Sequence, residues 1–197
     1  MHAFFHIATW NTRGGFGPEA ANHPGKLAKI HFLLTHNEVN CFQETHGNLN
    51  DIDAYLRRFF RTTHVWYIST LRRDAGGCLI AVKFTYLEPG TALESKFQIV
   101  KGRIIGCDFN SKAGPLRILC LHLVPGLAIA DIRRQILGIR ERICDFEQRC
   151  VLLCGDMNFA PPNEGSLDIN SNVVKPRPTS VVNLWDRLLG DRVTEFF

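Results

Sequence analysis

Five polar side chains that could carry out chemistry lie at or just beyond the ends of predicted apolar strands. They are Asn11, Glu44, His122, Asp156 and Asn158. In open α/β sheets, side chains at the strand ends converge on a ligand without having to be buried. Carboxylate and amide oxygens suit Mg²⁺, which keeps several waters and needs only one or two protein carboxylates. With the imidazole, these groups could hold a divalent cation and a phosphate at one edge of a sheet.

Each of these residues also has an ordinary structural explanation. Asn11 could be a turn residue that caps its strand. Glu44 could be a solvated surface carboxylate, although it directly follows an apolar strand, and His122 could be a hydrogen-bonded histidine of the core. We treat the nearby His46 as a surface residue. The five residues indicate a functional site more strongly when they are considered together and in their order along the chain.

The elements that must position these residues follow from the apolar periodicity. Strands over residues 4–9 and 39–43, with a helix over 26–37 between them, predict a β–α–β crossover. The same periodicity predicts further helices over residues 51–60, 129–146 and 181–189, and further strands over residues 64–70, 78–84, 97–100, 103–109, 116–121 and 151–154.

Two charged or polar stretches have ordinary explanations. Residues 160–180 are rich in Pro, Asn and Ser and predict a long surface loop. The helix over 129–146 carries arginines on its polar face, but it carries Asp131, Glu141 and Glu147 there too. A mixed-charge solvated face explains this pattern better than a phosphate-binding stripe.

The composition indicates one globular domain over residues 1–197. The chain is 45% hydrophobic and 21% charged, which excludes disorder by composition. A net charge of +4 is compatible with a polyanionic partner. Seven cysteines without a C-x-x-C pair predict buried thiols in a reducing compartment and exclude a zinc cluster. With no signal peptide or membrane span predicted, we expect a protein of the cytoplasm or nucleus with no membrane partner.

Several motifs resemble those of the endonuclease/exonuclease/phosphatase superfamily. The main ones are Thr-Trp-Asn-Thr-Arg-Gly at residues 9–14, Phe-Gln-Glu-Thr-His at 42–46, and Gly-Asp-Met-Asn at 155–158. Leu-His-Leu-Val-Pro at 121–125 is similar to a histidine motif of two branches of that family, and strands at 76–82 and 102–105 resemble its Gly-Gly and Gly-Arg strands. The resemblance implies a four-layer α/β sandwich, in which two mixed sheets pack face to face between helices.

The resemblance also implies roles for the individual residues. Glu44, helped by Asn11, would hold Mg²⁺ or Mn²⁺ against the phosphate. Asp156 would position the attacking water, and Asn158 would contact the phosphoryl oxygens. His122 would stabilise or protonate the leaving oxygen. In the Gly-rich turn after the first strand, Arg13 is a further predicted contact with the substrate.

One part of the family pattern is missing. Complete domains carry a Ser-Asp-His-like motif near the C-terminus, and this chain contains no Asp-His pair. The resemblance therefore covers about the first four-fifths of a complete domain, so that the sequence is either a fragment of a longer product or a truncated, impaired copy. In both cases we expect weak or absent hydrolysis by this chain alone.

Three functions fit the motifs. The first is a DNA endonuclease of the kind encoded by non-LTR retroelements, which the Gln-Glu-Thr-His motif favours, with DNA preferred over RNA as partner. That branch usually has Tyr-x-Pro where this chain has His122 and Pro125. The second is a phosphoesterase for RNA tails, phosphoinositides or sphingolipids, which the histidine favours. The third is a non-catalytic domain that binds nucleic acid.

Overall fold

A computed structural model describes residues 5–17, 20, 23–145, 150–158, 166–167, 174–175 and 179–189. These residues form two compact units. The first unit comprises the chain up to His122 together with the segment that ends at Asp156, and it holds eight strands and two helices. The second unit holds two helices and two short strands.

The first sheet of the first unit is built around the predicted crossover. Its strands lie in the order β1 (Ile7–Asn11), β2 (Val39–Gln43), β4 (Cys78–Lys83) and β3 (His64–Ser69). β1 runs parallel to β2, and the other two pairs are antiparallel. Helix α1 (Pro24–His36) connects the parallel strands, and its first turn accommodates Pro24 because that position needs no backbone donor. The predicted β–α–β unit is confirmed.

The second sheet contains the remaining long strands. Its order is β5 (Ser95–Val100), β6 (Ile104–Ser111), β7 (Gly114–His122) and β8 (Cys150–Asp156). β7 and β8 are parallel, and the other neighbours are antiparallel. The prediction of two mixed sheets is therefore confirmed.

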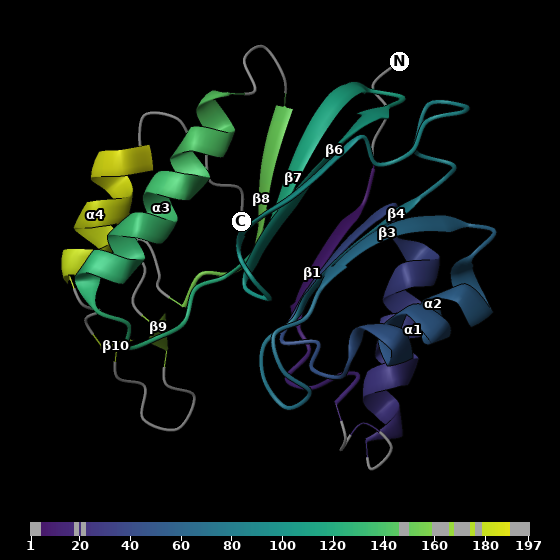
Figure 1. Cartoon of the computed structure of the whole chain (residues 1–197), viewed down its shortest axis with the longest axis horizontal. Helices are drawn as coiled ribbons and strands as arrows, with labels where there is room; N and C mark the ends of the chain where they lie inside the picture. The colour runs from purple at the N-terminus through teal and green to yellow at the C-terminus, as the bar shows by residue number, and fades with distance from the viewer. Residues whose placement is uncertain are drawn as a thin grey trace. The chain divides into compact units, whose positions relative to one another are not determined.

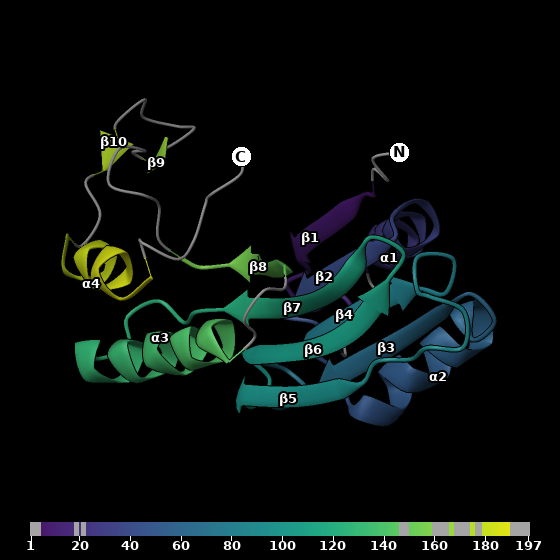
Figure 2. The same ribbon diagram turned by 90° about the horizontal axis from the view of Figure 1, so that it is seen from above.

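The two sheets pack face to face through apolar side chains from both. Ile80 of the first sheet and Ile105 and Ile118 of the second belong to one buried cluster, which also contains Cys41 and Cys120. Figure 1 shows the two layers, and Figure 2 shows the strands of both sheets stacked. The predicted burial of thiols holds for these two cysteines and for Cys78 and Cys107, whereas Cys144 and Cys154 are only partly buried and Cys150 is exposed.

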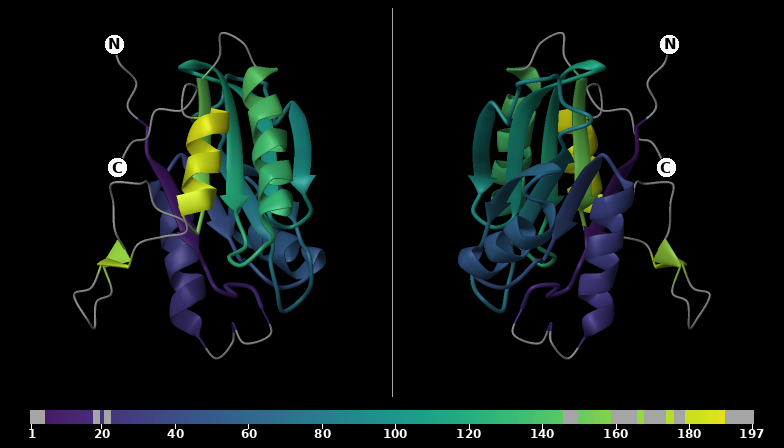
Figure 3. Two further views of the ribbon diagram at one scale, coloured as in Figure 1. Left: turned by 90° about the vertical axis from the view of Figure 1, so that its left-hand side faces the viewer. Right: turned by 90° about the vertical axis from the view of Figure 1, so that its right-hand side faces the viewer.

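Two helices cover the outer face of the first sheet. Helix α2 (Leu49–Phe60) begins after Asn48, whose side chain accepts the backbone N–H of Asp51. Ile30 and Leu34 of α1 and Leu56 of α2 pack against β2 and β4 in a second buried cluster. Figure 3 shows both helices on the side of the first sheet that faces away from the second sheet.

The second unit contains helices α3 (Ile129–Cys144) and α4 (Thr179–Leu189), which pack against each other. Strands β9 (Ser166–Leu167) and β10 (Val174–Lys175) form an antiparallel pair. Within residues 160–180, predicted as a long surface loop, the described residues therefore include these two short strands and the first residues of α4. Backbone pairing between two such short segments leaves no periodic apolar signal in the sequence.

Strands β1 and β8 end later than predicted, and each of them reaches a candidate residue. β1 starts later than expected and continues to Asn11, because that residue pairs with Gln43 of β2. β8 continues to Asp156, because that residue pairs with His122. Both residues are thus the last residues of their strands instead of following them. Residues 4 and 146, predicted at the ends of two elements, lie outside the described residues. None of the described helices is both long and apolar enough to cross a bilayer.

Candidate active site

Four of the predicted residues meet where parallel strands of both sheets end. The pairing of β1 with β2 places Asn11 beside Gln43, directly before Glu44, and the pairing of β7 with β8 places His122 beside Asp156. A side-chain hydrogen bond joins the two sheets at this end, since Nδ2 of Asn11 donates to Oδ2 of Asp156 at 2.8 Å. The carboxylate of Asp156 is thereby oriented by an amide from the opposite sheet.

A second set of contacts connects Glu44 to the same end of the sandwich. Oε1 of Glu44 lies 3.6 Å from Nε2 of His122 and 3.7 Å from Nη1 of Arg103. The imidazole is almost fully buried, whereas 26% of the Glu44 side chain is exposed. One part of the Glu44 carboxylate is therefore open to a ligand from solvent, and its inner side contacts His122 and Arg103.

The hydrogen bonds of His122 define which ring nitrogen carries the proton. Nη1 of Arg103 lies 2.5 Å from Nδ1 of His122, and a guanidinium can only donate. Nδ1 is therefore the acceptor, and Nε2 carries the hydrogen that faces Glu44. Burial lowers the pKa of His122, and the Arg103 charge lowers it further, although Glu44 and Asp156 act in the opposite direction. The ring is thus neutral at pH 7, and its Nε2–H can donate a hydrogen bond to an oxygen atom of a substrate bound beside Glu44.

The loops after β1 and β2 hold their candidate residues in an unusual backbone conformation. Arg13, Glu44 and His46 have φ of 46°, 49° and 52°, a region that residues other than glycine rarely adopt. The loops are fixed to each other because Thr12 N–H donates to Gln43 O at 2.8 Å and Gly14 N–H donates to Glu44 O at 2.7 Å. Such strain persists where surrounding contacts hold it, and it concentrates at functional sites.

Gln43 anchors the end of β2 from inside the sandwich. Its side chain is buried, and its Nε2 contacts Thr9 Oγ1 at 3.1 Å, Cys41 O at 3.0 Å and Cys120 Sγ at 3.2 Å. Because Cys120 belongs to the second sheet, this amide ties both sheets together beneath the polar cluster. The position of Glu44, the next residue, is therefore set by buried contacts.

The remaining predicted residues lie as follows. Arg13 is exposed, and its backbone N–H donates to Oδ1 of Asn11 at 3.1 Å. Asn158 belongs to the second unit, where its Nδ2 donates to Leu123 O at 2.6 Å, and its contact with phosphate stays a prediction. His46 was expected on the surface but is half-buried, and its ring lies so near Gly14 that a Cβ added at Gly14 would be 2.9 Å from its Nδ1.

Arg103 is the residue that the sequence did not identify as part of the site. It precedes β6, and its side chain is only 15% exposed. The Gly-Arg pair at residues 102–103 was the available signal, but an arginine at the start of a predicted strand is ordinarily a solvated residue. Only the packing of the two sheets shows that its guanidinium contacts both Glu44 and His122.

Comparison with known proteins gives the family of the chain. The model of the Endonuclease/Exonuclease/phosphatase family matches residues 8–193, which is nearly the whole sequence. The chain belongs to this family. No curated protein matches it in sequence.

Solved structures share the fold of this family member at low sequence identity. The AP endonuclease LMAP from Leishmania major matches with a TM-score of 0.65 and 14% identity, over 93% of this chain and 65% of that one. D. rerio TDP2, in complex with a single strand DNA product, matches with a TM-score of 0.61 and 15% identity, over 90% and 63%. The 3'-5' exonuclease NExo from Neisseria meningitidis gives 0.62 and 14%, over 93% and 70%. The chain thus spans less than two thirds of the first two proteins.

The oxygen donors at the strand ends fit the divalent metal that such a fold implies. Among the described residues, no three His, Cys, Asp or Glu side chains form a metal site made of protein alone. Mg²⁺ does not require one, because it keeps several waters and binds one or two carboxylates. The carboxylate of Glu44 and the amide oxygen of Asn11 are the groups that would hold it. Bound there, the metal would polarise a phosphoryl oxygen as a Lewis acid.

Proposed function

We propose that this chain is a divalent-metal-dependent phosphodiester hydrolase that acts on nucleic acid, with DNA as the preferred substrate and Mg²⁺ or Mn²⁺ as the metal. The observation that carries the proposal is the convergence of Asn11, Glu44, His122 and Asp156 at one end of the sandwich. The family of the chain supports it, as do the nucleic-acid enzymes among the solved structures of the same fold.

The side chains supply three functions in this proposal. Asp156, held by the Asn11 amide at 2.8 Å, accepts a proton from the attacking water. His122, neutral and carrying its hydrogen on Nε2, donates a hydrogen bond that stabilises the leaving oxygen, which takes its proton from water, and Arg103 holds the ring through Nδ1. A positioned acid or base of this kind contributes about 10²–10⁴-fold in rate. Arg13 is exposed beside Asn11 and contacts the phosphate backbone of the substrate.

Within this class, we propose a DNA endonuclease of retroelement type. The support is the Gln-Glu-Thr-His motif at residues 43–46 and the Gly-Gly strand at 76–82. The predicted contact of Asn158 with the phosphoryl oxygens belongs to the same proposal. Because a second acid–base pair is absent from the sequence, we expect the rate of cleavage to be low.

One observation favours a second candidate, a phosphoesterase for a substrate other than duplex DNA. His122 lies inside the polar cluster and contacts Glu44, so it is not merely a histidine of the core. By resemblance, the histidine motif is that of the deoxyribonuclease I-like and deadenylase-like branches of the family, and the deadenylase-like branch acts on RNA tails. Plasmid DNA, poly(A) RNA and inositol phosphates tested side by side would separate the two candidates.

The decisive experiment compares nicking of supercoiled plasmid by wild type and two isosteric variants, Glu44→Gln and Asp156→Asn, in Mg²⁺, in Mn²⁺ and in EDTA. We expect slow nicking that EDTA and both variants abolish. Glu88→Gln and Asp131→Asn make the same chemical changes at exposed or partly exposed carboxylates and should leave the rate unchanged. Equal rates for wild type and Glu44→Gln would contradict the proposal.

A further inference from the structure

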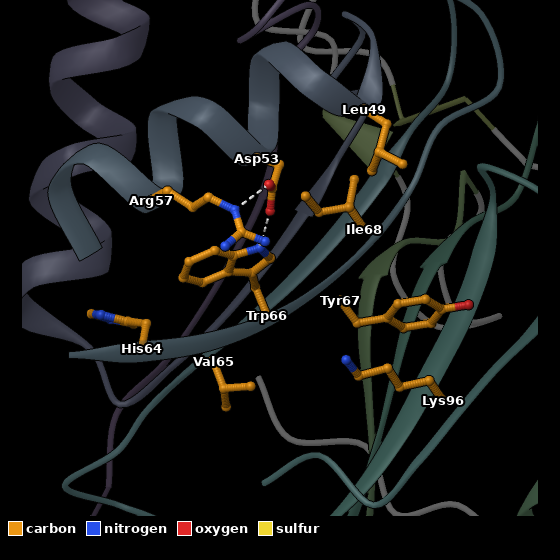
Figure 4. A pocket seen from close by; sticks show the side chains of 9 residues that line it. All are labelled: Leu49, Asp53, Arg57, His64, Val65, Trp66, Tyr67, Ile68 and Lys96. Atoms are coloured by element: carbon orange, nitrogen blue, oxygen red, sulfur yellow. Dashed lines mark hydrogen bonds and ion pairs between the residues drawn. The ribbon is translucent and has the colours of Figure 1, made fainter. Parts of the chain in front are cut away.

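A groove of about 380 Å³ lies along the outer edge of β3, on a side of the first unit that the proposed reaction does not use. Leu49, Asp53 and Arg57 of α2 form one wall, β3 forms the floor, and Lys96 of β5 forms the other wall. Figure 4 shows these side chains around the strand. Among the described residues, no strand pairs with this edge of β3, which is the last strand of its sheet.

The pairing of β3 with β4 determines which backbone groups face the groove. Phe84 N–H donates to Thr63 O, and the antiparallel register continues from this bond. In an antiparallel ladder, alternate residues direct both backbone groups to the same neighbour. Val65, Tyr67 and Ser69 therefore bond to β4, and the N–H and C=O groups of Trp66 and Ile68 point into the groove. The groove thus offers the hydrogen bonds that an added strand needs.

The side chains on the two faces of β3 differ in character. Trp66 and Ile68 lie on the face that packs toward the helices, next to Leu49. Tyr67 lies on the opposite face, toward the second sheet, where Lys96 is exposed. Directly opposed residues of neighbouring strands point to the same side of a sheet. Along an added strand, side chains would therefore lie alternately on the face of Trp66 and Ile68 and on the face of Tyr67.

We propose that this groove binds an extended peptide that adds to β3 and alternates apolar with acidic residues. The apolar residues contact Trp66, Ile68 and Leu49, and the acidic residues face Lys96. Such β-strand addition takes its affinity from main-chain hydrogen bonds and its specificity from alternate side chains. The second cation of the groove, Arg57, is already paired with Asp53, so the charge that an acidic partner meets is that of Lys96.

The same groove suits a nucleic acid poorly. The carboxylate of Asp53 lies in its wall and accepts both the Arg57 guanidinium and the indole N–H of Trp66. Phosphates would meet this carboxylate, and the indole is held in place by it instead of being available to stack on a base.

The test measures binding by fluorescence anisotropy, with a labelled hexapeptide of alternating valine and aspartate as the probe. The whole 197-residue chain should bind it in preference to a hexapeptide of alternating valine and lysine. Lys96→Glu should weaken binding of the acidic peptide at least about fivefold. Lys112→Glu, the same change at an exposed lysine outside the groove, should not. Equal binding of both peptides, or equal effects of both variants, would overturn the proposal.

A second arm tests strand addition itself. In one peptide the backbone amides of the three valines are N-methylated, and in another peptide those of the three aspartates are N-methylated, which removes these N–H donors. Only one alternate set of amides can face β3, so one peptide should lose binding and the other should keep it. Loss in both or in neither would exclude strand addition. Competition by a single-stranded oligonucleotide, or a dimer of the chain that Lys96→Glu abolishes, would assign the groove to a different occupant and overturn the proposal. None of these measurements depends on hydrolysis.

Discussion

Nη1 of Arg103 donates to Nδ1 of His122 at 2.5 Å, and the same guanidinium lies 3.7 Å from the carboxylate of Glu44. One partly buried cation therefore contacts two neighbours that differ in chemistry. It supplies the donor that Nδ1 of a neutral imidazole needs, and it offsets the charge of a half-buried carboxylate. Because the three groups share contacts, changes to them should not act independently.

The first prediction concerns the coupling of Arg103 with His122. Arg103→Met leaves Nδ1 without its donor, and His122→Gln removes the acceptor of the guanidinium. Each single variant should lose stability, and the double variant should lose about 1–2 kcal/mol less than the sum, because the second change removes a group that is already unsatisfied. Urea denaturation at pH 7 of the four proteins measures this difference. The control cycle pairs Arg57→Met with His122→Gln, which share no described contact and should be additive. Additivity in both cycles would refute the coupling.

The second prediction concerns stabilisation by a metal. A ligand that binds only the folded chain stabilises it by about 1.4 kcal/mol at ten times its dissociation constant, which raises the midpoint of thermal unfolding by a few degrees. We expect this rise with Mg²⁺ and Mn²⁺ for wild type and for Glu88→Gln. Glu44→Gln should show none, because an amide replaces the principal charged donor. Scanning calorimetry with and without metal provides the measurement. A rise of the same size in Glu44→Gln would place the metal elsewhere.

The sequence was sufficient to predict the elements and most of the cluster for a physical reason. Apolar periodicity marks strands, and polar residues at or just beyond the ends of these strands mark candidate site positions, so Asn11, Glu44 and Asp156 could be found without coordinates. Parallel neighbours bring such ends together. The β–α–β unit that contains Asn11 and Glu44 follows from the same local signals.

The rest depends on contacts between residues far apart in the chain. Arg103 enters the site because β6 pairs with β7, and its role is visible only from the guanidinium–imidazole distance. The positive φ of Glu44 comes from the hydrogen bonds between two loops, which composition does not encode. The groove beside β3 exists because that strand is last in the sheet order, although it is third in the sequence.

The third prediction concerns the pH dependence of stability at His64. This ring is buried, with Nε2 3.0 Å from Leu34 O and Nδ1 2.8 Å from Thr63 Oγ1. Burial lowers its pKa to about 4, with Lys83 acting in the same direction. The unfolded chain therefore binds the proton more readily than the folded chain. The stability from neutral His64 is complete above pH 6.5 and is lost as the pH falls toward 4.

The matching measurement is urea denaturation at pH 7 and pH 5. His64 should cost wild type up to about 2 kcal/mol across this interval. His64→Gln cannot titrate, so its loss should be smaller by that amount, whereas His23→Gln, at an exposed histidine, should behave like wild type. If wild type and His64→Gln lose the same stability, then protonation of His64 is not the cause.

The fourth prediction concerns Gly155, which precedes Asp156. Its φ is +149°, and a Cβ at this position would lie 2.0 Å from the carbonyl oxygen of Leu121 on the neighbouring strand β7. Backbone atoms cannot yield as a flexible side chain can, so Gly155→Ala must push β8 away from β7 at the end that carries His122 and Asp156.

We expect Gly155→Ala to lower the free energy of unfolding by about 2–4 kcal/mol, since a residue with Cβ is strained at this φ and also clashes. Gly25→Ala is the matched control, because a Cβ there meets no atom within 4 Å and lies in the first turn of α1. It should be neutral or stabilise the chain by up to about 1 kcal/mol. Because the clash lies next to Asp156, the variant should also lose its metal-dependent cleavage at temperatures where it remains folded. A folded and fully active Gly155→Ala protein would show that the spacing of β7 and β8 does not determine the position of Asp156.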